Sequence, residues 1–232
     1  MGATRRVLPL AAGGKAPARL PRRFFSPDPR VVAERLIGKL LVRDDGRAGR
    51  LVEVEAYLGE LDPGSHAFRG PTPRSAIMWG PPGVLYVYFS YGVHWCANIV
   101  CGAEGNASAV LLRAAEPVAG LDAMRAARLN GRVPARDLPV RDLCRGPGRL
   151  TQAFGITGAD NGLDLTPPAR ASALLWLADD GAGPGGEVVA TPRVGLAEGR
   201  GADLPWRYVL LGSPWASPGP PPLSEDASRA PL

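Results

Sequence analysis

Lysine is almost absent from this chain of 232 residues, which carries 25 arginines but only Lys15 and Lys39. An enzyme that works through a lysine Schiff base would therefore depend on an amine in the N-terminal tail or at the end of an expected helix. Cysteine is scarce as well, with three residues at no regular spacing. An odd count without a spaced set argues against a disulfide framework, so we expect the protein in a reducing compartment, the cytoplasm.

Histidine and long apolar runs are also lacking. The two histidines are His66 and His94, and His94 with Cys96 and Cys101 has no fourth ligand at a usual zinc spacing, so we expect no metal and no cofactor. The apolar run over 7–12 follows two arginines, as in a signal peptide, but it is short and contains a proline. No other segment approaches membrane-spanning length, and we expect neither secretion nor membrane contact.

Positive charge is concentrated near the N-terminus. The formal net charge is +5, and six basic residues precede Asp28, the first acid, which leaves 21 basic and 22 acidic residues (a net charge of −1) over 24–232. Eight arginines accompany four acids over 113–149, whereas five arginines accompany nine acids over 150–232. One basic face that binds phosphates and a genome that uses arginine for lysine both fit this pattern.

The chain is long enough for one domain, since 45% of its residues are hydrophobic. We expect a disordered basic tail over 1–23, a domain over 24–215 and a Pro/Ser-rich tail over 216–232. The first helix is expected to begin with Ser26 as N-cap and Pro27 at its first position. Apolar periodicity with Gly and Pro boundaries predicts helices over 26–38, 121–130 and 149–154, and strands over 39–42, 51–58, 84–91, 93–100, 107–114, 172–177, 186–194 and 207–211.

The strand over 51–58 is the most informative of these. Strand periodicity puts one set of side chains on one face, Leu51, Glu53, Glu55 and Tyr57, and a second set on the other, Val52, Val54, Ala56 and Leu58. The second set is core. The two acids and the tyrosine lead into the Gly/Pro-rich loop over 59–83 and can form a cleft wall, although acids that are merely solvated fit the spacing better. Spacing alone does not distinguish Glu53 from Glu55.

Other residues stand out by their position. Tyr86 and Tyr88 share a strand face, which favours ordinary sheet packing over a base-stacking platform. Tyr91 precedes a glycine at an expected turn, where a large ring can project as a wedge. His66 lies in the loop and is a candidate for hydrogen bonding in a cleft. Arg113 ends an apolar strand and needs a carboxylate or a ligand beside it.

Several short motifs occur in order along the chain: Glu53-Val-Glu-Ala-Tyr-Leu-Gly59, His66, Thr72-Pro-Arg74, Gly83-Val-Leu-Tyr-Val-Tyr88, Tyr91-Gly92, Asn98-Ile99, Leu111-Leu-Arg-Ala-Ala-Glu-Pro117, Leu143-Cys-Arg-Gly-Pro147 and Gly212-Ser-Pro-Trp215. Together they resemble the 3-methyladenine (alkyladenine) DNA glycosylase family of the mammalian type, in a bacterial version. The resemblance runs from about Phe24 to Trp215. It departs from the mammalian pattern at Val93-His94-Trp95, in a shorter loop after His66 and in a slightly longer segment over 102–107.

The resemblance implies a single mixed α+β domain, with a curved antiparallel β-sheet, surrounding helices and a protruding β-hairpin that inserts into DNA. It implies base-excision repair: a purine of the 3-methyladenine, 7-methylguanine, hypoxanthine or ethenoadenine type is flipped out of duplex DNA and its N-glycosidic bond is hydrolysed, leaving an abasic site. The expected partner is double-stranded DNA with damaged purines, bound by a monomer in the cytoplasm at the nucleoid. With no suitable lysine, we expect no lyase activity.

The resemblance also assigns roles to residues. Glu55 resembles the general base, and Arg113 and the main-chain carbonyl of Val194 resemble its partners in holding the attacking water. The remaining matches are pocket walls at Tyr57, His66 and Tyr88, a screen against guanine at Asn98, a residue that fills the gap in the duplex at Tyr91, and DNA contacts at Thr72, Arg74, Met78 and Arg149. Two rival functions keep other roles open: an RNA-binding module without chemistry, and a carbohydrate hydrolase that uses Glu53 and Glu55 as acid and base.

Overall fold

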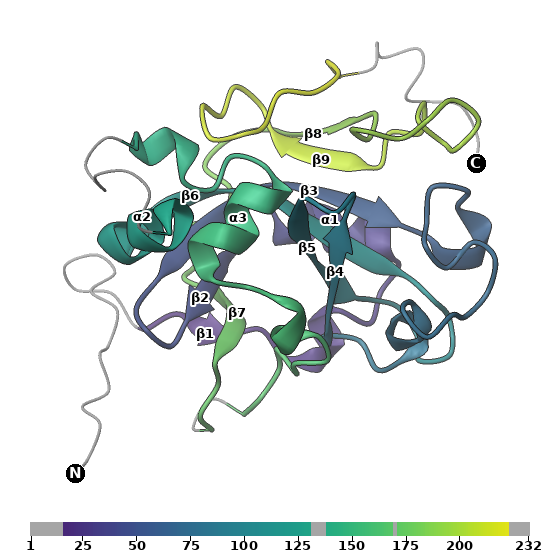
Figure 1. Ribbon diagram of the computed structural model, residues 1–232, viewed down its shortest axis with the longest axis horizontal. Helices are drawn as coiled ribbons and strands as arrows, with labels where there is room; N and C mark the ends of the chain where they lie inside the picture. The colour runs from purple at the N-terminus through teal and green to yellow at the C-terminus, as the bar shows by residue number, and fades with distance from the viewer. Residues whose placement is uncertain (1–15, 131–137, 169–170, 223–232) are drawn as a thin grey trace.

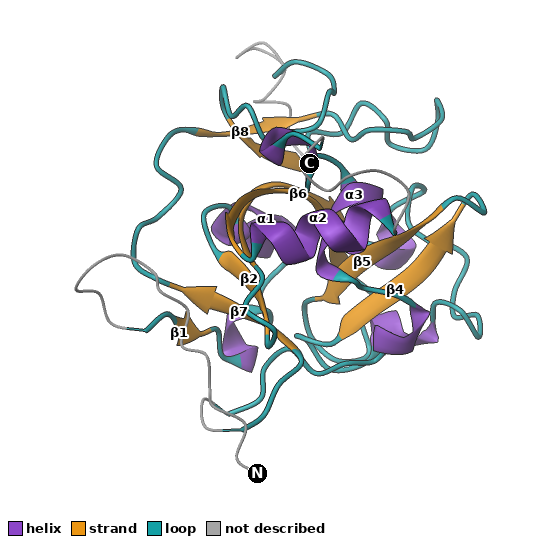
Figure 2. Cartoon of the chain, turned by 60° about the vertical axis from the view of Figure 1, so that its left-hand side comes forward, coloured by secondary structure: helices purple, strands orange, loops and turns teal. Residues whose placement is uncertain are grey.

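The computed structural model describes residues 16–130, 138–168 and 171–222, which form an antiparallel sheet curled around α-helices (Figures 1 and 2). Nine strands pair in the order β1-β7-β2-β3-β6-β5-β4, and β9 pairs with both β3 and β8. The strands are β1 (Ala18–Arg19), β2 (Leu40–Arg43), β3 (Ala48–Tyr57), β4 (Leu85–Ser90), β5 (His94–Val100), β6 (Ala109–Ala119), β7 (Leu175–Asp179), β8 (Val188–Thr191) and β9 (Arg207–Leu210). The α-helices are α1 (Pro29–Leu36), α2 (Leu121–Leu129) and α3 (Pro147–Phe154), and short 3₁₀ helices are η1 (Arg22–Phe24), η2 (Gly59–Leu61), η3 (Ala76–Trp79), η5 (Val140–Asp142) and η6 (Gly158–Asp160).

The helices lie in the curve of the sheet and close the main core (Figure 2). Leu36 of α1, Met124 of α2 and Phe154 of α3 are fully buried against apolar side chains of β3, β5 and β6. Burial of each such side chain contributes about 2 kcal/mol. This architecture confirms the expected α+β class with a curled antiparallel sheet. Within the described residues, no helix is both long and apolar enough to cross a membrane.

Helix α1 begins two residues later than expected. Asp28 rather than Ser26 is the N-cap, since its carboxylate accepts a hydrogen bond from the Arg30 amide at 2.8 Å. Pro29 rather than Pro27 then takes the first helical position. Ser26-Pro27 and Asp28-Pro29 each offer an N-cap residue followed by proline. The helix begins at the second pair, because the Asp28 carboxylate also accepts a hydrogen bond from the Arg30 guanidinium at 2.9 Å.

Strand β3 is the centre of the sheet. It pairs with β6 along its length, and on its other edge it pairs first with β2 and then, from Glu53 to Glu55, with β9. The ladder with β6 is irregular between Leu51 and Val54, where β3 changes its partner. Leu51 therefore joins the same core cluster as Val54 and Ala56, and its expected place beside the acids was wrong. The irregularity separates an ordinary core segment from the segment that carries both acids.

Strands β4 and β5 pair from Leu85 opposite Ile99 to Ser90 opposite His94, as the turn near Tyr91 predicted. Tyr91 has a positive φ of 48° and is 90% exposed. A non-glycine residue in this left-handed region is held there by its turn, which points the ring away from the core.

The chain ends differ from expectation where the structure describes them. Residues 16–23 were expected to be disordered, but Ala18 and Arg19 form β1, which pairs with the edge strand β7. The amide of Leu20 adds a hydrogen bond to the carbonyl of Leu177 in β7. At the other end, Ser217 is bonded to the interior of the domain. The remaining tail residues, 1–15 and 223–232, lie outside the described residues.

Predicted strand bounds were less accurate than strand existence. The strand expected over 107–114 continues to Ala119, and the one expected over 172–177 lies at Leu175–Asp179. The segment over 186–194 is a strand only at Val188–Thr191, and its last residues turn into the site.

Candidate active site

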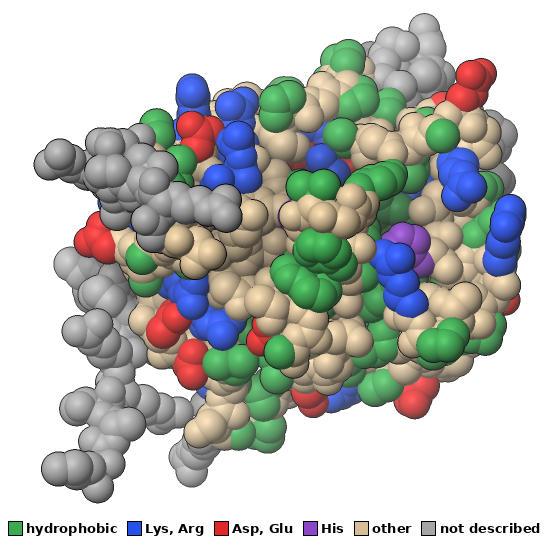
Figure 3. Space-filling view, in the orientation of Figure 1, with side chains coloured by type: hydrophobic (Ala, Val, Ile, Leu, Met, Phe, Trp, Pro, Cys, Tyr) green, Lys and Arg blue, Asp and Glu red, His purple; other side chains and the backbone are tan. Residues whose placement is uncertain are grey.

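A cavity of about 660 Å³ opens beside β3, β4 and β5. Nine of the twelve residues expected in the site line it: Tyr57, His66, Arg74, Met78, Tyr88, Tyr91, Asn98, Arg113 and Val194. Figure 3 shows this face, where basic side chains in blue gather beside histidine in purple and hydrophobic side chains in green. A volume in this range fits a small organic ring system.

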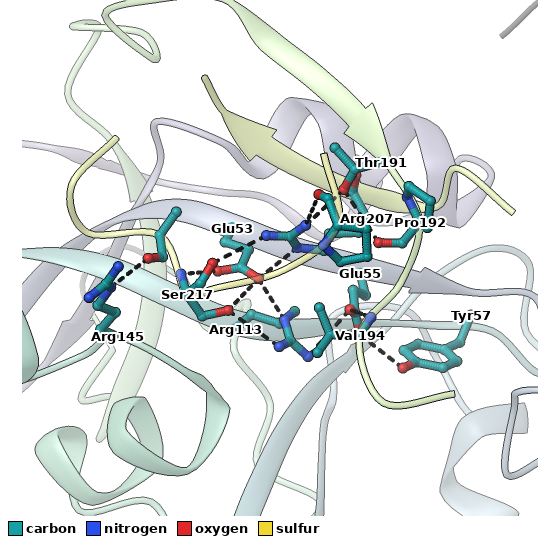
Figure 4. Close-up of polar contacts among 12 residues, drawn as sticks. Glu53, Glu55, Tyr57, Arg113, Arg145, Thr191, Pro192, Val194, Arg207 and Ser217 are labelled. Carbon is teal, nitrogen blue, oxygen red and sulfur yellow. Dashed lines mark hydrogen bonds and ion pairs between the residues drawn. The ribbon is translucent and has the colours of Figure 1, made fainter. Parts of the chain in front are cut away.

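Glu55 lies directly behind the cavity lining, with no exposed surface. Its Oε1 accepts the Val194 amide at 2.8 Å and lies 3.3 Å from Nη1 of Arg113, and its Oε2 accepts the Tyr57 hydroxyl at 2.9 Å (Figure 4). All three donors line the cavity. The carboxylate is therefore buried as a hydrogen-bonded anion whose partners reach the ligand space.

Glu53 is equally buried but faces away from the cavity. Its Oε1 accepts from Nε of both Arg113 and Arg207, at 2.7 and 2.8 Å, and from the Ser217 hydroxyl at 2.7 Å. Its Oε2 accepts the Ser217 amide at 2.6 Å (Figure 4). Burial by itself would raise the pKa of Glu53, but the charges of the two arginines and the Ser217 hydrogen bond outweigh burial and hold that pKa below its ordinary value. Two of the three partners of Glu53, Arg207 and Ser217, lie outside the cavity lining, whereas all partners of Glu55 line it; this argues against the use of Glu53 as an acid in sugar hydrolysis.

Arg113 connects the two acids. Its Nε bonds to Glu53 and its Nη1 faces Glu55, so one guanidinium is shared between both carboxylates. Burial works to lower its pKa, but Glu55 and Glu53 together raise it above the ordinary value. The side chain is therefore a permanent cation, fixed in direction by Glu53 and offered to Glu55 and the cavity.

Tyr57 remains a hydrogen-bond donor at all ordinary pH values. Burial and then the nearby charge of Glu55 raise the pKa of its phenol well above the usual value. Its ring lines the cavity and its hydroxyl holds Oε2 of Glu55. Tyr57 thus belongs both to the cavity wall and to the carboxylate's hydrogen-bond shell.

Aromatic rings form the opposite wall. The His66 ring lies 4.4 Å from the Tyr88 ring, centroid to centroid, and Tyr88 lies 5.5 Å from Tyr86. Nδ1 of His66 is 3.0 Å from the Tyr86 hydroxyl. Burial and then the charge of Arg74 lower the pKa of His66, so its imidazole is neutral near pH 7. The expectation of ordinary sheet packing for Tyr86 and Tyr88 misses that their shared face is a cavity wall.

Asn98 closes the base of this wall. It lies opposite Tyr86 in the β4–β5 ladder, and its Nδ2 donates to the Tyr86 carbonyl at 3.2 Å. The side chain is 4% exposed and lines the cavity, so its carboxamide has one fixed orientation.

The residues expected to contact DNA lie in different surroundings. Thr72 and Arg74 are exposed, and Arg74 lies 4.9 Å over the Tyr88 ring and donates to the Phe89 carbonyl at 3.1 Å. Arg149 is exposed and pairs with Asp142 at 3.0 Å. Met78 is only 2% exposed and packs against Tyr86. Met78 therefore lines the cavity as part of an apolar cluster with little exposed surface, and its expected contact with DNA stays a prediction.

Several residues of the site were missed by sequence reasoning. Ser217 and Arg207 complete the shell of Glu53, and Asp62 and Arg193 form an ion pair at 2.6 Å with no exposed side-chain surface. Only Arg193 gave a signal, since a lone arginine precedes Val194 at the end of an apolar segment. Among the described residues, no three His, Cys, Asp or Glu side chains are placed to hold a metal ion.

Comparisons with known proteins agree on one family. The family model described as methylpurine-DNA glycosylase (MPG) matches residues 23–214. A protein of Burkholderia lata named "Putative 3-methyladenine DNA glycosylase" is 52% identical over 198 residues, covering 85% of this chain and 90% of its own length. Proteins with the same name from Rhodopseudomonas palustris, 48% identical over 90% of this chain and 96% of theirs, and from Koribacter versatilis, 46% identical over 86% and 93%, are similar too. The chain therefore belongs to the methylpurine-DNA glycosylase family.

Proposed function

We propose that this protein is a DNA-repair glycosylase that removes alkylated or deaminated purines from duplex DNA by hydrolysis of the N-glycosidic bond. The observation that supports this most directly is the buried Glu55 carboxylate, held by three donors that line a cavity with aromatic walls. The names of the similar proteins, which specify 3-methyladenine, support an alkylated purine as substrate. The protein acts as a hydrolase on DNA, as its family does.

The target base must first leave the helix, because its glycosidic bond is out of reach inside the stack. Unstacking costs a few kcal/mol and less for a damaged pair. The ring of Tyr91, at the tip of the β4–β5 turn, would stack in the gap and offset this cost. Thr72, Arg74 and Arg149 would contact the DNA backbone, with Arg149 leaving Asp142 for a phosphate.

Glu55 would carry the chemical step. Departure of the purine builds oxocarbenium character on the sugar, which a nearby carboxylate stabilises. The same carboxylate would accept a proton from water, while Arg113 and the Val194 carbonyl orient that water toward the anomeric carbon. One hydrogen bond reaches each carboxylate oxygen of Glu55, and Arg113 pairs with Oε1 as an ion, which leaves acceptor capacity for a further donor such as water.

The cavity would select damaged purines by small differences. Tyr57 and Tyr88 offer flat faces that suit delocalised or cationic bases, and neutral His66 supplies a hydrogen bond without charge repulsion. Asn98, with its fixed carboxamide, would block the exocyclic amine of guanine. The expected substrates are 3-methyladenine, 7-methylguanine, hypoxanthine and ethenoadenine.

A base-release assay tests the proposal. The protein is incubated with duplexes that contain hypoxanthine, ethenoadenine or an alkylated purine, and free base is measured together with strand cleavage after alkali. Release of damaged but not normal bases is the expected result, whereas DNA or RNA binding without release from any lesion would favour a binding module. Borohydride trapping should give no covalent adduct, because the chain has only two lysines: Lys39, which does not line the cavity, and Lys15, which lies outside the described residues in the Arg/Pro-rich N-terminal tail of the sequence. A trapped adduct would instead reveal a lyase.

A further inference from the structure

Arg193 is a buried cation that ties together the segments around the cavity. Its Nη1 and Nη2 bind the two carboxylate oxygens of Asp62 at 2.6 and 2.8 Å. The same nitrogens donate to the Ala56 carbonyl of β3 at 3.1 Å and to the Gly201 carbonyl at 3.3 Å. Asp62 in turn accepts the amides of Leu58 and Gly64. One guanidinium thus connects β3, the loop after it and the loop that follows β8.

Two aromatic rings hold the guanidinium. Its central carbon lies 4.7 Å from the Tyr57 ring centre and 4.9 Å from that of Trp206. In the described part of the chain, Nε of Arg193 is the one buried side-chain polar atom without a hydrogen-bond partner. Native structures leave few buried polar atoms without a partner, so this position calls for an explanation.

Both Oε1 and Oε2 of Glu55 depend on this arginine. Val194 follows Arg193 directly in the chain and donates its amide to Oε1 at 2.8 Å. Tyr57, whose ring lies against the guanidinium, donates its hydroxyl to Oε2 at 2.9 Å. We propose that Arg193, fixed by Asp62, is a positioning residue that sets the direction of the Glu55 carboxylate through these two donors. This inference depends on the proposed role of Glu55 in base release.

Lysine cannot replace this arrangement. A planar guanidinium can bind Asp62 with two nitrogens, donate to two carbonyls and lie flat against two rings at once, whereas an ammonium is a compact point charge. Arg193→Lys keeps the charge opposite Asp62, so no buried acid is left without a counter-charge. The substitution removes the plane that orders Tyr57 and the loop of Val194, and small misplacements of catalytic groups lower rates steeply.

Arg50 offers a matched control. It also binds both oxygens of an aspartate, Asp180, at 2.6 and 3.1 Å, and it also donates to a backbone carbonyl, that of Gly38. Arg50 lies on β3, the strand to which Arg193 donates, but Arg50 is outside the cavity lining and its side-chain hydrogen-bond partners are Gly38 and Asp180. Any loss that follows simply from weakening a bidentate Arg–Asp pair should appear also in Arg50→Lys.

The experiment compares Arg193→Lys, Arg50→Lys and the native protein in single-turnover base release with saturating enzyme. We expect Arg193→Lys to slow release by about 10- to 100-fold, with the Kd for lesion duplex unchanged within about 3-fold because no DNA-contacting side chain is altered. Arg50→Lys should release base at the native rate and lose less Tm than Arg193→Lys, because the Arg50–Asp180 pair is partly exposed. Equal rates in the two variants would overturn the proposal.

Hydrogen exchange at the Val194 amide gives a readout that does not need activity. Exchange should be at least about 10-fold faster in Arg193→Lys than in Arg50→Lys, because the bond to Glu55 opens more often. Unchanged exchange at Val194 overturns the positioning role even when release is slow. If Arg193→Lys does not fold, Trp206→Leu takes its place, because it removes the second ring beside Arg193. The proposal then requires that Trp206→Leu both slow base release and speed up exchange of the Val194 amide.

The two proposals fail in different ways. A native protein that releases no base from any lesion contradicts the proposed function, whatever the variants do. A native protein that releases base normally, with an Arg193→Lys variant that matches it, leaves the function intact and removes Arg193 from the set of positioning residues.

Discussion

Glu53 and Glu55 stand two residues apart on one strand, share Arg113 and are both fully buried, yet their surroundings differ. Glu53 is held by Arg113, Arg207 and Ser217, and of these three only Arg113 lines the cavity. Glu55 is held by donors that all line the cavity. The comparison shows how one strand supplies a structural acid and a candidate catalytic acid: the difference lies in which segments pack against each carboxylate.

The largest effect is expected from Glu55→Gln. The amide keeps the shape and can still accept hydrogen bonds, but it neither carries charge nor takes a proton, so base release should fall by about 10³-fold or more. Binding of lesion duplex, measured by fluorescence anisotropy, should persist. Glu116→Gln, on the neighbouring strand β6 and outside the cavity lining, is the control and should release base at the native rate. Near-native turnover by Glu55→Gln would remove the distinction between the two acids.

Glu53→Gln should act mainly on stability. It leaves Arg113 and Arg207 with one buried counter-charge fewer, which costs about 3 kcal/mol of the free energy of unfolding. Base release should fall only about 10-fold, since the amide oxygen of Gln can still accept from Arg113 and only the charge that fixes the direction of Arg113 is removed. Urea unfolding and single-turnover release measure the two effects. A loss of release as large as that of Glu55→Gln would show that the acids act as one unit.

The acid dependence of stability should separate the two positions further. The pKa of Glu53 is below its ordinary value of 4.5, so its ionised form contributes stability that is complete above the unfolded pKa and is lost as pH falls through the folded pKa. The native protein should therefore lose stability as pH falls below about 4.5, and Glu53→Gln should lose less over the same range. Urea midpoints between pH 3 and pH 7 give the comparison; parallel curves would contradict it.

The smallest effect is expected from Ser217→Ala. It removes the hydroxyl bond to Glu53 but keeps the amide bond, so the free energy of unfolding should fall by about 1.5 kcal/mol and release by less than about 3-fold. Ser26→Ala, at an exposed position, should change stability by less than about 0.5 kcal/mol. Thermal unfolding of both variants and the native protein measures the two stability changes. An unchanged Tm in Ser217→Ala would mean that the hydroxyl bond to Glu53 adds no stability beyond the bond from the Ser217 amide.

Local patterns predicted much of the fold and one wall of the site. Alternation correctly put Tyr86 and Tyr88 on one face, and the turn at Tyr91 correctly left that ring exposed. These features depend on neighbours in sequence. The place of Leu51 could not be predicted, because it depends on where β3 changes its pairing partner from β2 to β9.

The difference between the two acids was equally hidden from periodicity. Period-2 geometry treats Glu53 and Glu55 alike, and only the resemblance to a family separated them. Physically, the separation comes from Arg207 and Ser217, which lie 154 and 164 residues further along the chain. The burial of Met78 likewise depends on packing against Tyr86 rather than on its own loop.

The bonds between Ser217 and Glu53 have a consequence for the order in which the protein is made. Strand β3 leaves the ribosome 164 residues before the segment that completes the shell of Glu53. Until Ser217 arrives, a partly folded chain has one acid of its central strand incompletely covered, and Arg113 lacks a rigid anchor. Assembly of the site therefore waits for synthesis to reach Ser217: a chain that stops short of Ser217 contains every residue that lines the cavity but lacks the hydrogen bonds that Ser217 donates to Glu53 behind it.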